Sequence, residues 1–293
     1  MLQHPFRLFA NRSAGTPGMV VLPEGGWRRA RAEITAWPGY APTPLLNLQA
    51  TAARAGIAVL RLKDEAGRFG LGSFKALGGA YAVGQVLAAE QARGARPLTV
   101  TCATDGNHGR SVAWGAQRFG CRCVIFVHEA VSQGRVDAIA AYGADVRRVP
   151  GNYDDAVREA ARVAAAEGWH VISDTSWPGY TTVPVDVMQG YRLMAEEAFT
   201  QWGGAPPTHI FIQGGVGGVA AAVSVQARAT WPAPPKLIVA EPDRAACLLA
   251  SAEAGEPTAV GGALDTLMAG LACGEPSLLA WRELGRAAFA FMA

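Results

Sequence analysis

Cysteine is scarce in this sequence, and its arrangement excludes whole classes of protein. The 293 residues include five cysteines, an odd number, which stand at Cys102, Cys121, Cys123, Cys247 and Cys273. Because no second Cys or His pair with zinc spacing accompanies Cys121 and Cys123, the sequence predicts no metal site. Scattered thiols of this kind are typical of reduced proteins, so we expect a cytoplasmic location.

Excess charge of one sign and long apolar runs are also lacking. The formal net charge is +2, which is too small to attract nucleic acid, and no segment reaches the length of a membrane span. The N-terminal segment carries His4, Arg7, Asn11 and Arg12 without the apolar stretch of a secretory signal. We therefore expect neither nucleic acid nor a membrane as a partner.

Aromatic residues make up only 8% of the chain, but half of all residues are hydrophobic, which is enough for the core of a sizeable enzyme. From about residue 58, short β-branched runs alternate with longer alanine-rich stretches of helical period. This alternation indicates an α/β fold with mostly parallel sheets. The predicted strands are 58–62, 98–103, 123–127, 145–149, 170–173, 209–213 and 237–240. The predicted helices are 74–93, 109–119, 134–142, 153–167, 185–202, 218–229 and 245–254.

The order of these elements predicts two domains. Residues 77–183 hold four strand-helix units, enough for a small open-sheet domain inserted into a larger one made of residues 1–76 and 184–293. The run at 179–184 would return the chain to the larger domain. Ligands of open parallel sheets sit at the carboxyl ends of the strands, so we expect a ligand in the cleft between the domains.

One lysine stands out for its position. Lys75 follows a small residue at a predicted helix start, in the run Ser73-Phe74-Lys75. An amine that forms an imine with an aldehyde must be held on a fixed element and must lose its proton on partial burial. The ordinary alternative is a surface lysine, but Gly78 and Gly79 allow close helix packing just after it. We therefore interpret Lys75 as a reactive amine.

A polar loop from Thr104 to Gly109 follows the predicted strand at 98–103. Asn107 would donate a hydrogen bond to the ring oxygen of a cofactor. The amides from Gly106 onward, together with Thr104 and His108, would receive a substrate carboxylate at the helix start. A plain turn and helix cap is the ordinary interpretation of Asp-Gly-Asn-His. The run lies at the carboxyl end of a predicted parallel strand, and this position favours ligand binding. We interpret His108 as an orienting residue rather than a general base.

A glycine loop stands between the predicted strand at 209–213 and an alanine-rich helix, and it consists of Gly214, Gly215, Val216, Gly217 and Gly218. Its amides and the helix dipole would hold a phosphate. The same run fits the degenerate dinucleotide fingerprint, with Glu241 where a ribose-binding acid would stand, so a nicotinamide oxidoreductase is a competing interpretation. That interpretation leaves Lys75 and Asp105 without a role. Lysine, polar loop and glycine loop together predict a pyridoxal 5'-phosphate site.

Residues from about Asn47 to Trp281 also resemble a known family. The resemblance is carried by Leu62-Lys63-Asp64-Glu65, Arg68-Phe69-Gly70-Leu71, Ser73-Phe74-Lys75, Leu77-Gly78-Gly79, Thr104 to Arg110, Asp174-Thr175, Trp177, Gly179-Tyr180 and Met268 to Pro276. With these motifs the chain resembles the fold-type II pyridoxal-phosphate enzymes, and among them the diaminopropionate ammonia-lyase family. The resemblance implies two open, twisted, mostly parallel sheets, the cofactor in the cleft between them, and a homodimer.

The same resemblance implies a reaction. The family eliminates ammonia from 2,3-diaminopropionate, in its D and L forms, to give pyruvate and ammonia. Carried over by motif, Asp105 would take the α-proton of the D isomer and Asp174 that of the L isomer, with Lys75 and Phe74 at the cofactor. Dehydratases of the superfamily typically have serine or threonine in place of Asp105 and arginine in place of Leu77. A serine- or threonine-type dehydratase is therefore the alternative, and a strand-end cap is the alternative for Asp174.

The C-terminus departs from the family pattern. The family normally continues beyond this length, and nothing after Trp281 resembles its Ser-Gly-Glu-Ser-Gly region, which supplies the partner of the pyridine nitrogen. The resemblance thus implies that the large domain is incomplete, and an inactive cofactor-binding homologue is a further alternative. The exact amino-acid substrate, its stereochemistry, the oligomeric state and the activity stay open at this stage.

Overall fold

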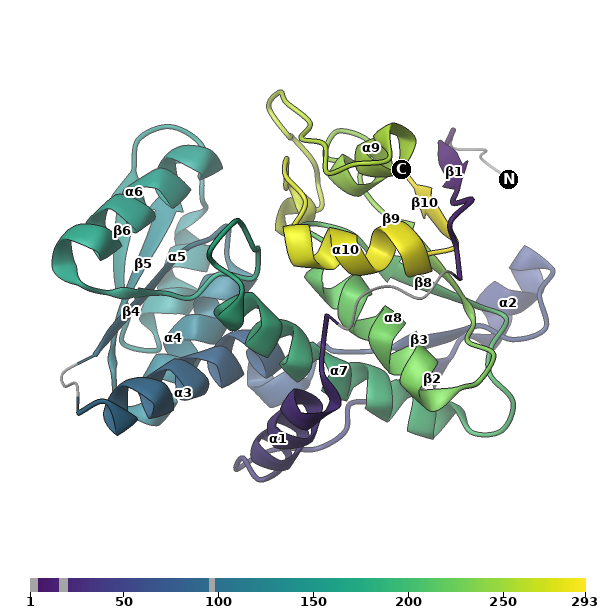
Figure 1. Cartoon of the computed structure of the whole chain (residues 1–293), viewed down its shortest axis with the longest axis horizontal. Helices are drawn as coiled ribbons and strands as arrows, with labels where there is room; N and C mark the ends of the chain where they lie inside the picture. The colour runs from purple at the N-terminus through teal and green to yellow at the C-terminus, as the bar shows by residue number, and fades with distance from the viewer. Residues whose placement is uncertain (1–4, 16–20, 95–97) are drawn as a thin grey trace.

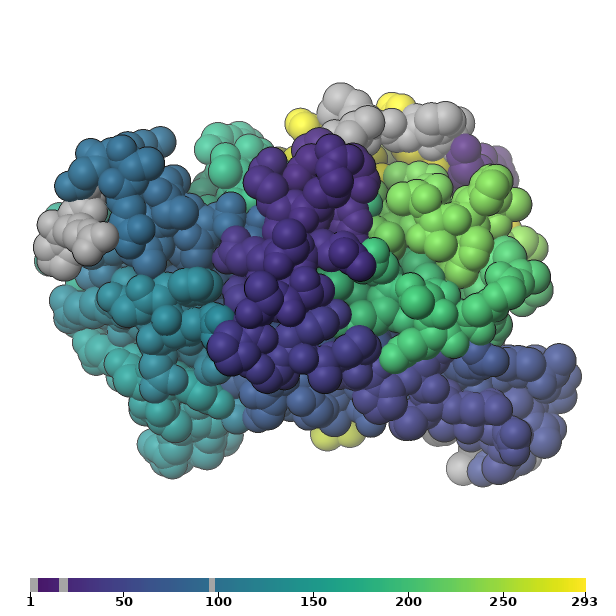
Figure 2. Space-filling model, turned by 90° about the horizontal axis from the view of Figure 1, so that it is seen from below, coloured from purple at the N-terminus to yellow at the C-terminus, as the bar shows by residue number. Residues whose placement is uncertain are grey.

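The computed structural model describes residues 5–15, 21–94 and 98–293 (Figure 1). The chain starts with six short elements: β1 (Leu8–Ala10), α1 (Glu24–Thr35), β2 (Leu45–Asn47), α2 (Gln49–Ala55), β3 (Arg61–Lys63) and the 3-10 turn η1 (Arg68–Gly70). β2 and β3 form a small antiparallel sheet. Figure 2 shows the early part of the chain, in purple, lying across the middle of one face. An ion pair of 3.2 Å between Arg192 and Glu24 holds α1 in this place.

Four parallel strands form the first large sheet, which we call the β4 sheet. Its order is β6-β5-β4-β7. The strands are β4 (Thr99–Ala103), β5 (Arg122–His128), β6 (Asp145–Val149) and β7 (His170–Val171). The helices that belong to it are α3 (Ala76–Ala92), α4 (Asn107–Phe119), α5 (Gln133–Ala140) and α6 (Tyr153–Glu167).

Strand β5 is apolar on both faces because helices cover the β4 sheet on both sides. Val124 and Phe126 pack against α6 on one face of the sheet. The alternate residues Ile125 and Val127 belong to the main core on the other face, together with Val112 of α4. Successive side chains of a strand point to opposite faces, so a continuous apolar run is what a doubly covered parallel strand requires.

The second large sheet, the β8 sheet, has the order β1-β10-β9-β8. Its later strands are β8 (His209–Gln213), β9 (Lys236–Ala240) and β10 (Ala290–Met292), which run parallel, whereas β1 pairs antiparallel with β10. The remaining elements are α7 (Thr182–Trp202), α8 (Gly218–Thr230), α9 (Cys247–Ala254), the 3-10 turn η2 (Ala269–Leu271) and α10 (Leu278–Ala287). Leu8 faces Met292 across the β1–β10 pair, so the first and last strands of the chain lie side by side (Figure 1).

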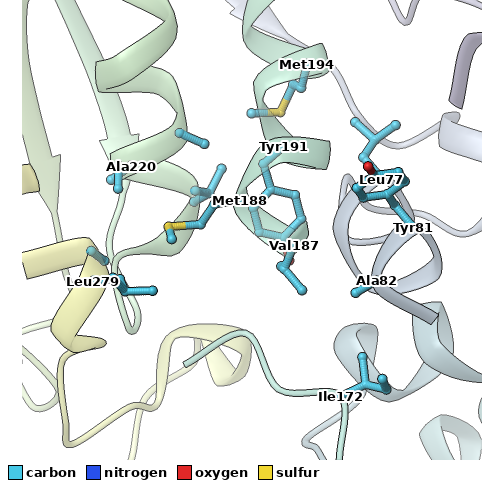
Figure 3. Packing of buried hydrophobic residues seen from close by; sticks show 14 of the residues in the cluster. Leu77, Tyr81, Ala82, Ile172, Val187, Met188, Tyr191, Met194, Ala220 and Leu279 are labelled. Atoms are coloured by element: carbon cyan, nitrogen blue, oxygen red, sulfur yellow. The ribbon is translucent and has the colours of Figure 1, made fainter. Parts of the chain in front are cut away.

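Helices α3, α7 and α8 connect the two large sheets through one hydrophobic core. Leu77, Tyr191, Met188 and Ala220 are all at most 1% exposed and come from these three helices (Figure 3). Glycine lets α3 and α7 approach closely, since a methyl group added to Gly190 would stand 2.6 Å from the carbonyl carbon of Leu77. Lys75 directly precedes α3, so this crossing positions the lysine.

The predicted fold class is confirmed, because both large sheets consist mostly of parallel strands with helices between them. Two details of the prediction were wrong. The strand expected at 58–62 is β3, and it pairs with β2 outside the parallel sheets. The expected linker at 179–184 overlaps a helix, since α7 begins at Thr182. The division at residues 77–183 stays a prediction. Among the described residues, no helix is long and apolar enough to cross a membrane.

Candidate active site

A cavity of about 260 Å³ lies where the β4 sheet, the β8 sheet and the start of α3 meet. Most of the residues singled out from the sequence line it, namely Phe74, Lys75, Thr104, Asp105, Gly106, Asn107, His108, Asp174, Gly215, Val216, Gly217 and Gly218. The segments that carry them are separated by up to about 140 residues of chain but follow the carboxyl ends of parallel strands or begin helices, where ligands of such sheets bind. Tertiary folding therefore collects them in one place.

Lys75 forms an ion pair with Asp174 inside this cavity. Burial lowers the pKa of Lys75, but the nearby negative charge of Asp174 outweighs burial and raises it above the ordinary lysine value. Burial likewise raises the pKa of Asp174, and the charge of Lys75, with a smaller effect of His108, outweighs it and lowers the net pKa. Asp174 is thus held as a carboxylate.

Asp105 has a different environment at the same cavity. Its Oδ1 atom lies 2.8 Å from Nε2 of His128, the last residue of β5. Burial raises the pKa of Asp105, and the neighbouring His128, Arg135 and Lys75 reduce this effect without reversing it. The two predicted carboxylates therefore differ, since the pKa of Asp174 is lowered and that of Asp105 is raised.

The polar loop is held by its own threonine. Thr104 Oγ1 accepts hydrogen bonds of 3.0 Å from the amides of Gly106 and Gly109. Gly106 has φ 155° and ψ −85°, a conformation open to glycine alone. The loop then passes directly into α4, whose first residue is Asn107. The hydroxyl of Thr104 thus shapes the loop, while Asn107 lines the cavity.

His108 is buried and held in a defined orientation. Its Nε2 atom lies 2.8 Å from the carbonyl oxygen of Ile172, which must accept, so Nε2 carries the proton. Its Nδ1 atom lies 3.9 Å from Asp174 Oδ2. Burial lowers the pKa of His108, so the ring is neutral at pH 7. The orienting role expected from the sequence stays a prediction.

The glycine loop forms a cradle at the start of α8. Gly217 has φ 97°, in the region that favours glycine. A Cβ atom at Gly215 would stand 3.3 Å from Cys273 Sγ, and one at Gly218 would stand 3.5 Å from the carbonyl oxygen of Asp174. Side chains here would fill the space beside the cavity, whereas glycines leave backbone amides open to an anion at a helix N-terminus.

Gly214 and Glu241 do not face the cavity. Gly214 is absent from the cavity lining in the part of the chain that the structure describes, and a Cβ at this position would stand 2.8 Å from Cγ of Glu241. The carboxylate of Glu241 accepts hydrogen bonds from the amides of Leu248 and Leu249, at 2.9 and 2.7 Å. Glu241 is therefore used as a helix cap, and the acid that a ribose-binding site would need is not available.

Sequence reasoning missed several residues of the site, four of which have titratable side chains. Tyr153, Tyr191 and Cys273 line the cavity, and His128 contacts Asp105 beside it. Tyr153 begins α6 just after a strand, and His128 ends β5, so their positions at strand ends were a usable signal. Tyr191 lies within a long helix, and only the crossing of α7 with α3 brings it to the cavity.

The site combines a largely buried lysine at a helix start with a glycine cradle for an anion, which fits pyridoxal phosphate. The family model described as pyridoxal-phosphate dependent enzyme matches residues 36–291. This match covers most of the chain, which therefore belongs to the pyridoxal-phosphate-dependent enzymes of fold type II. The predicted cofactor and fold-type II resemblance are confirmed.

Within this class the chain belongs to the diaminopropionate ammonia-lyase family. The enzyme of that name from Escherichia coli K12 is 42% identical over 271 residues, which are 87% of this chain and 68% of the relative. The crystal structure of diaminopropionate ammonia-lyase from Escherichia coli in complex with D-serine superposes with a TM-score of 0.91 at 37% identity, over 99% of this chain and 77% of that one. The biosynthetic L-threonine dehydratase of Escherichia coli K12 is more distant, at 30% identity over 236 residues, 80% of this chain and 43% of the relative.

Proposed function

We propose that the chain eliminates ammonia from D- and L-2,3-diaminopropionate, with one water consumed and pyruvate and two molecules of ammonia formed. The observation that carries this proposal is the placement of two largely buried carboxylates at the cavity that contains Lys75: Asp174 pairs with Lys75, and Asp105 is hydrogen-bonded to His128. Their environments also shift their pKa values in opposite directions. Residues whose environments drive their pKa values apart are typical of acid and base roles in catalysis. The sequence similarity to diaminopropionate ammonia-lyase supports the choice of reaction.

Pyridoxal phosphate, when bound, supplies an electron sink for negative charge at the substrate α-carbon. Lys75 would hold its aldehyde carbon, Asn107 would donate to its ring oxygen, and the amides from Gly215 to Gly218 would bind its phosphate. Phe74 packs edge-on against Tyr191 at 5.0 Å between ring centroids, and this pair bounds the cavity beside the lysine. Aromatic walls of this kind exclude water from the reacting atoms.

The two carboxylates would then divide the proton chemistry. Asp174 would take the α-proton of the L isomer, and Asp105 that of the D isomer. Each carboxylate is also suited to attract the second ammonium group, which distinguishes diaminopropionate from serine or threonine. The amides of the loop from Gly106 to His108, at the start of α4, would bind the substrate carboxylate.

The first test concerns Lys75. The chain contains three lysines, Lys63, Lys75 and Lys236. Borohydride reduction of the holoprotein should attach the pyridoxyl group to Lys75, and Lys75→Ala should lose the visible absorbance band of the bound cofactor. Lys236→Ala is the matched control, since Lys236 is exposed at the start of β9 and should leave the band unchanged. A peptide map that places the pyridoxyl group on Lys63 or Lys236 would contradict the assignment.

The second test separates the carboxylates. Asp105→Asn should reduce kcat for the D isomer about a hundredfold to ten-thousandfold with little effect on the L isomer, and Asp174→Asn should do the reverse. Pyruvate is measured with a coupled dehydrogenase, with L-serine as a comparison substrate. Equal losses for both isomers in both variants would mean that the carboxylates bind substrate jointly and do not act as separate bases.

We further propose that two copies associate and that the protein is cytoplasmic. The family resemblance supports association, and the five free cysteines support a reducing compartment. Size-exclusion chromatography with light scattering measures the first directly, and a single-chain mass would refute it. Cell fractionation tests the second.

A further inference from the structure

His128 and Asp105 come from neighbouring strands whose carboxyl ends meet beside the cavity. His128 is the last residue of β5, and Asp105 follows the end of β4, which pairs with β5 in parallel. The Nε2 atom of His128 lies 2.8 Å from Asp105 Oδ1. Both side chains are about four-fifths buried, at 20% and 19% exposure. A carboxylate can only accept in this contact, so Nε2–H donates.

We propose that His128 is a positioning residue for Asp105, which orients this carboxylate and keeps it ionised, and thereby determines how efficiently the D isomer is processed. The inference rests on the proposed function, because the reaction at Asp105 is part of it. The hydrogen bond occupies Oδ1, and the second oxygen, Oδ2, is the one that the proposed role requires to reach the α-proton.

The charges around Asp105 explain why a donor matters at this position. Burial raises the pKa of Asp105, and His128 provides the largest opposing effect, followed by Arg135 of α5 and by Lys75. Lys75 is paired with Asp174. Arg135 lies over the loop, and its Cδ would be 3.5 Å from a Cβ atom at Gly106. His128 is thus the one partner of these three that bonds the carboxylate directly.

Two further titratable groups face Asp105 from other elements. Tyr153 of α6 and Cys273, which follows η2, both line the cavity, and the negative charge of Asp105 contributes to raising the pKa of each. Burial raises the pKa of both groups further, so both are neutral at pH 7 and neither brings a positive charge to Asp105. A protonated Asp105 can neither accept the α-proton nor attract an ammonium group. Loss of His128 should therefore move the acid limb of the pH–rate profile for the D isomer to higher pH.

The experiment compares His128→Ala and His128→Gln with the wild-type holoprotein. The glutamine amide places an N–H donor near the site of Nε2, whereas alanine removes it. His209→Gln is the matched control, because His209 is an exposed histidine at the start of β8. For each protein, kcat and kcat/KM are measured for D- and L-diaminopropionate from about pH 5 to pH 9. The pKa of Asp105 is followed independently by ¹³C NMR of its carboxyl carbon, with the resonance assigned from its absence in Asp105→Asn.

In His128→Ala we expect the acid limb of the pH–rate profile for the D isomer to move to higher pH by about 1 unit, because a charge-assisted hydrogen bond of this kind corresponds to a pKa change of about that size. At pH values on this acid limb, kcat/KM for the D isomer should fall about tenfold. The L isomer should change less than about twofold, which a general loss of structure would not produce. His128→Gln should recover most of the D-isomer rate. The carboxyl pKa of Asp105 should rise in His128→Ala and stay unchanged in His209→Gln.

Parallel losses for both isomers, an unmoved acid limb, or a glutamine variant that behaves like alanine would each overturn the role of His128. A wild-type protein that releases pyruvate from neither isomer would instead refute the proposed function. In that case the carboxyl pKa of Asp105 still decides the inference, since an equal value in wild type and His128→Ala would contradict it.

Discussion

Replacing Gly190 with alanine should damage both the fold and the site, because this glycine sets the distance between α7 and α3. An alanine Cβ would stand 2.6 Å from the carbonyl carbon of Leu77 and 3.0 Å from Cα of Gly78. Comfortable contacts between carbon atoms lie near 3.5–4.0 Å, so the two helices must separate by about 1 Å. The obstructing atoms belong to the backbone of α3, and a change of rotamer cannot relieve the overlap.

The magnitude follows from two opposing effects. Overpacking of a close-packed core costs about 1–3 kcal/mol and occasionally more, and contact with backbone places this site at the upper end. Alanine recovers up to about 1 kcal/mol over glycine in a helix interior. We therefore expect a net loss of about 2 kcal/mol in the free energy of unfolding. A 1 Å displacement of Lys75, just before α3, should also lower kcat about a hundredfold.

Urea unfolding followed by circular dichroism measures the first effect, and pyruvate formation measures the second. Gly134→Ala is the matched control, since Gly134 lies in helix α5 and no atom within 4 Å would meet its Cβ. That variant should gain about 0.5–1 kcal/mol and keep full activity. A Gly190→Ala protein with a wild-type urea midpoint and wild-type turnover would refute the reasoning, because it would mean that the helices separate at no cost.

Two further predictions concern elements that support the cavity. Burial raises the pKa of Glu241 to about 7, against the opposing hydrogen bonds from the amides of Leu248 and Leu249. Because the folded value lies above the unfolded value of 4.5, the associated stability is present below about pH 4.5 and is lost as the pH rises through about 7. Wild type should therefore lose about 3 kcal/mol over this range that Glu241→Gln does not lose, as measured by urea midpoints at several pH values. Asn152 caps α6 through a capping box with Asp155, so Asn152→Ala should lower the unfolding free energy by about 1 kcal/mol, and an unchanged midpoint would show that the cap contributes nothing.

Local sequence patterns determined most of the elements around the site. Continuous apolar strands and alanine-rich helices have distinct periods, so β5, β8 and α6 could be predicted close to their observed bounds. Lys75, the polar loop and the glycine loop were recognisable because each sits where a strand ends or a helix begins. The strands β1, β2 and β10 and the helices α1, α2 and α10 were not predicted. β1 and β10 exist through pairing across the whole length of the chain, and a three-residue strand carries too little pattern of its own.

Only the tertiary structure decided which charged groups meet. The sequence predicts Asp105 and Asp174 alike as acidic residues near a cofactor, but folding places one against Lys75 and the other against His128. Glu241 matched a dinucleotide fingerprint by spacing, and the fold turns its carboxylate to the amides that begin α9. Such pairings depend on the register of neighbouring strands and on the distance at which helices cross. These are properties of residues far apart in the chain, and no local periodicity encodes them.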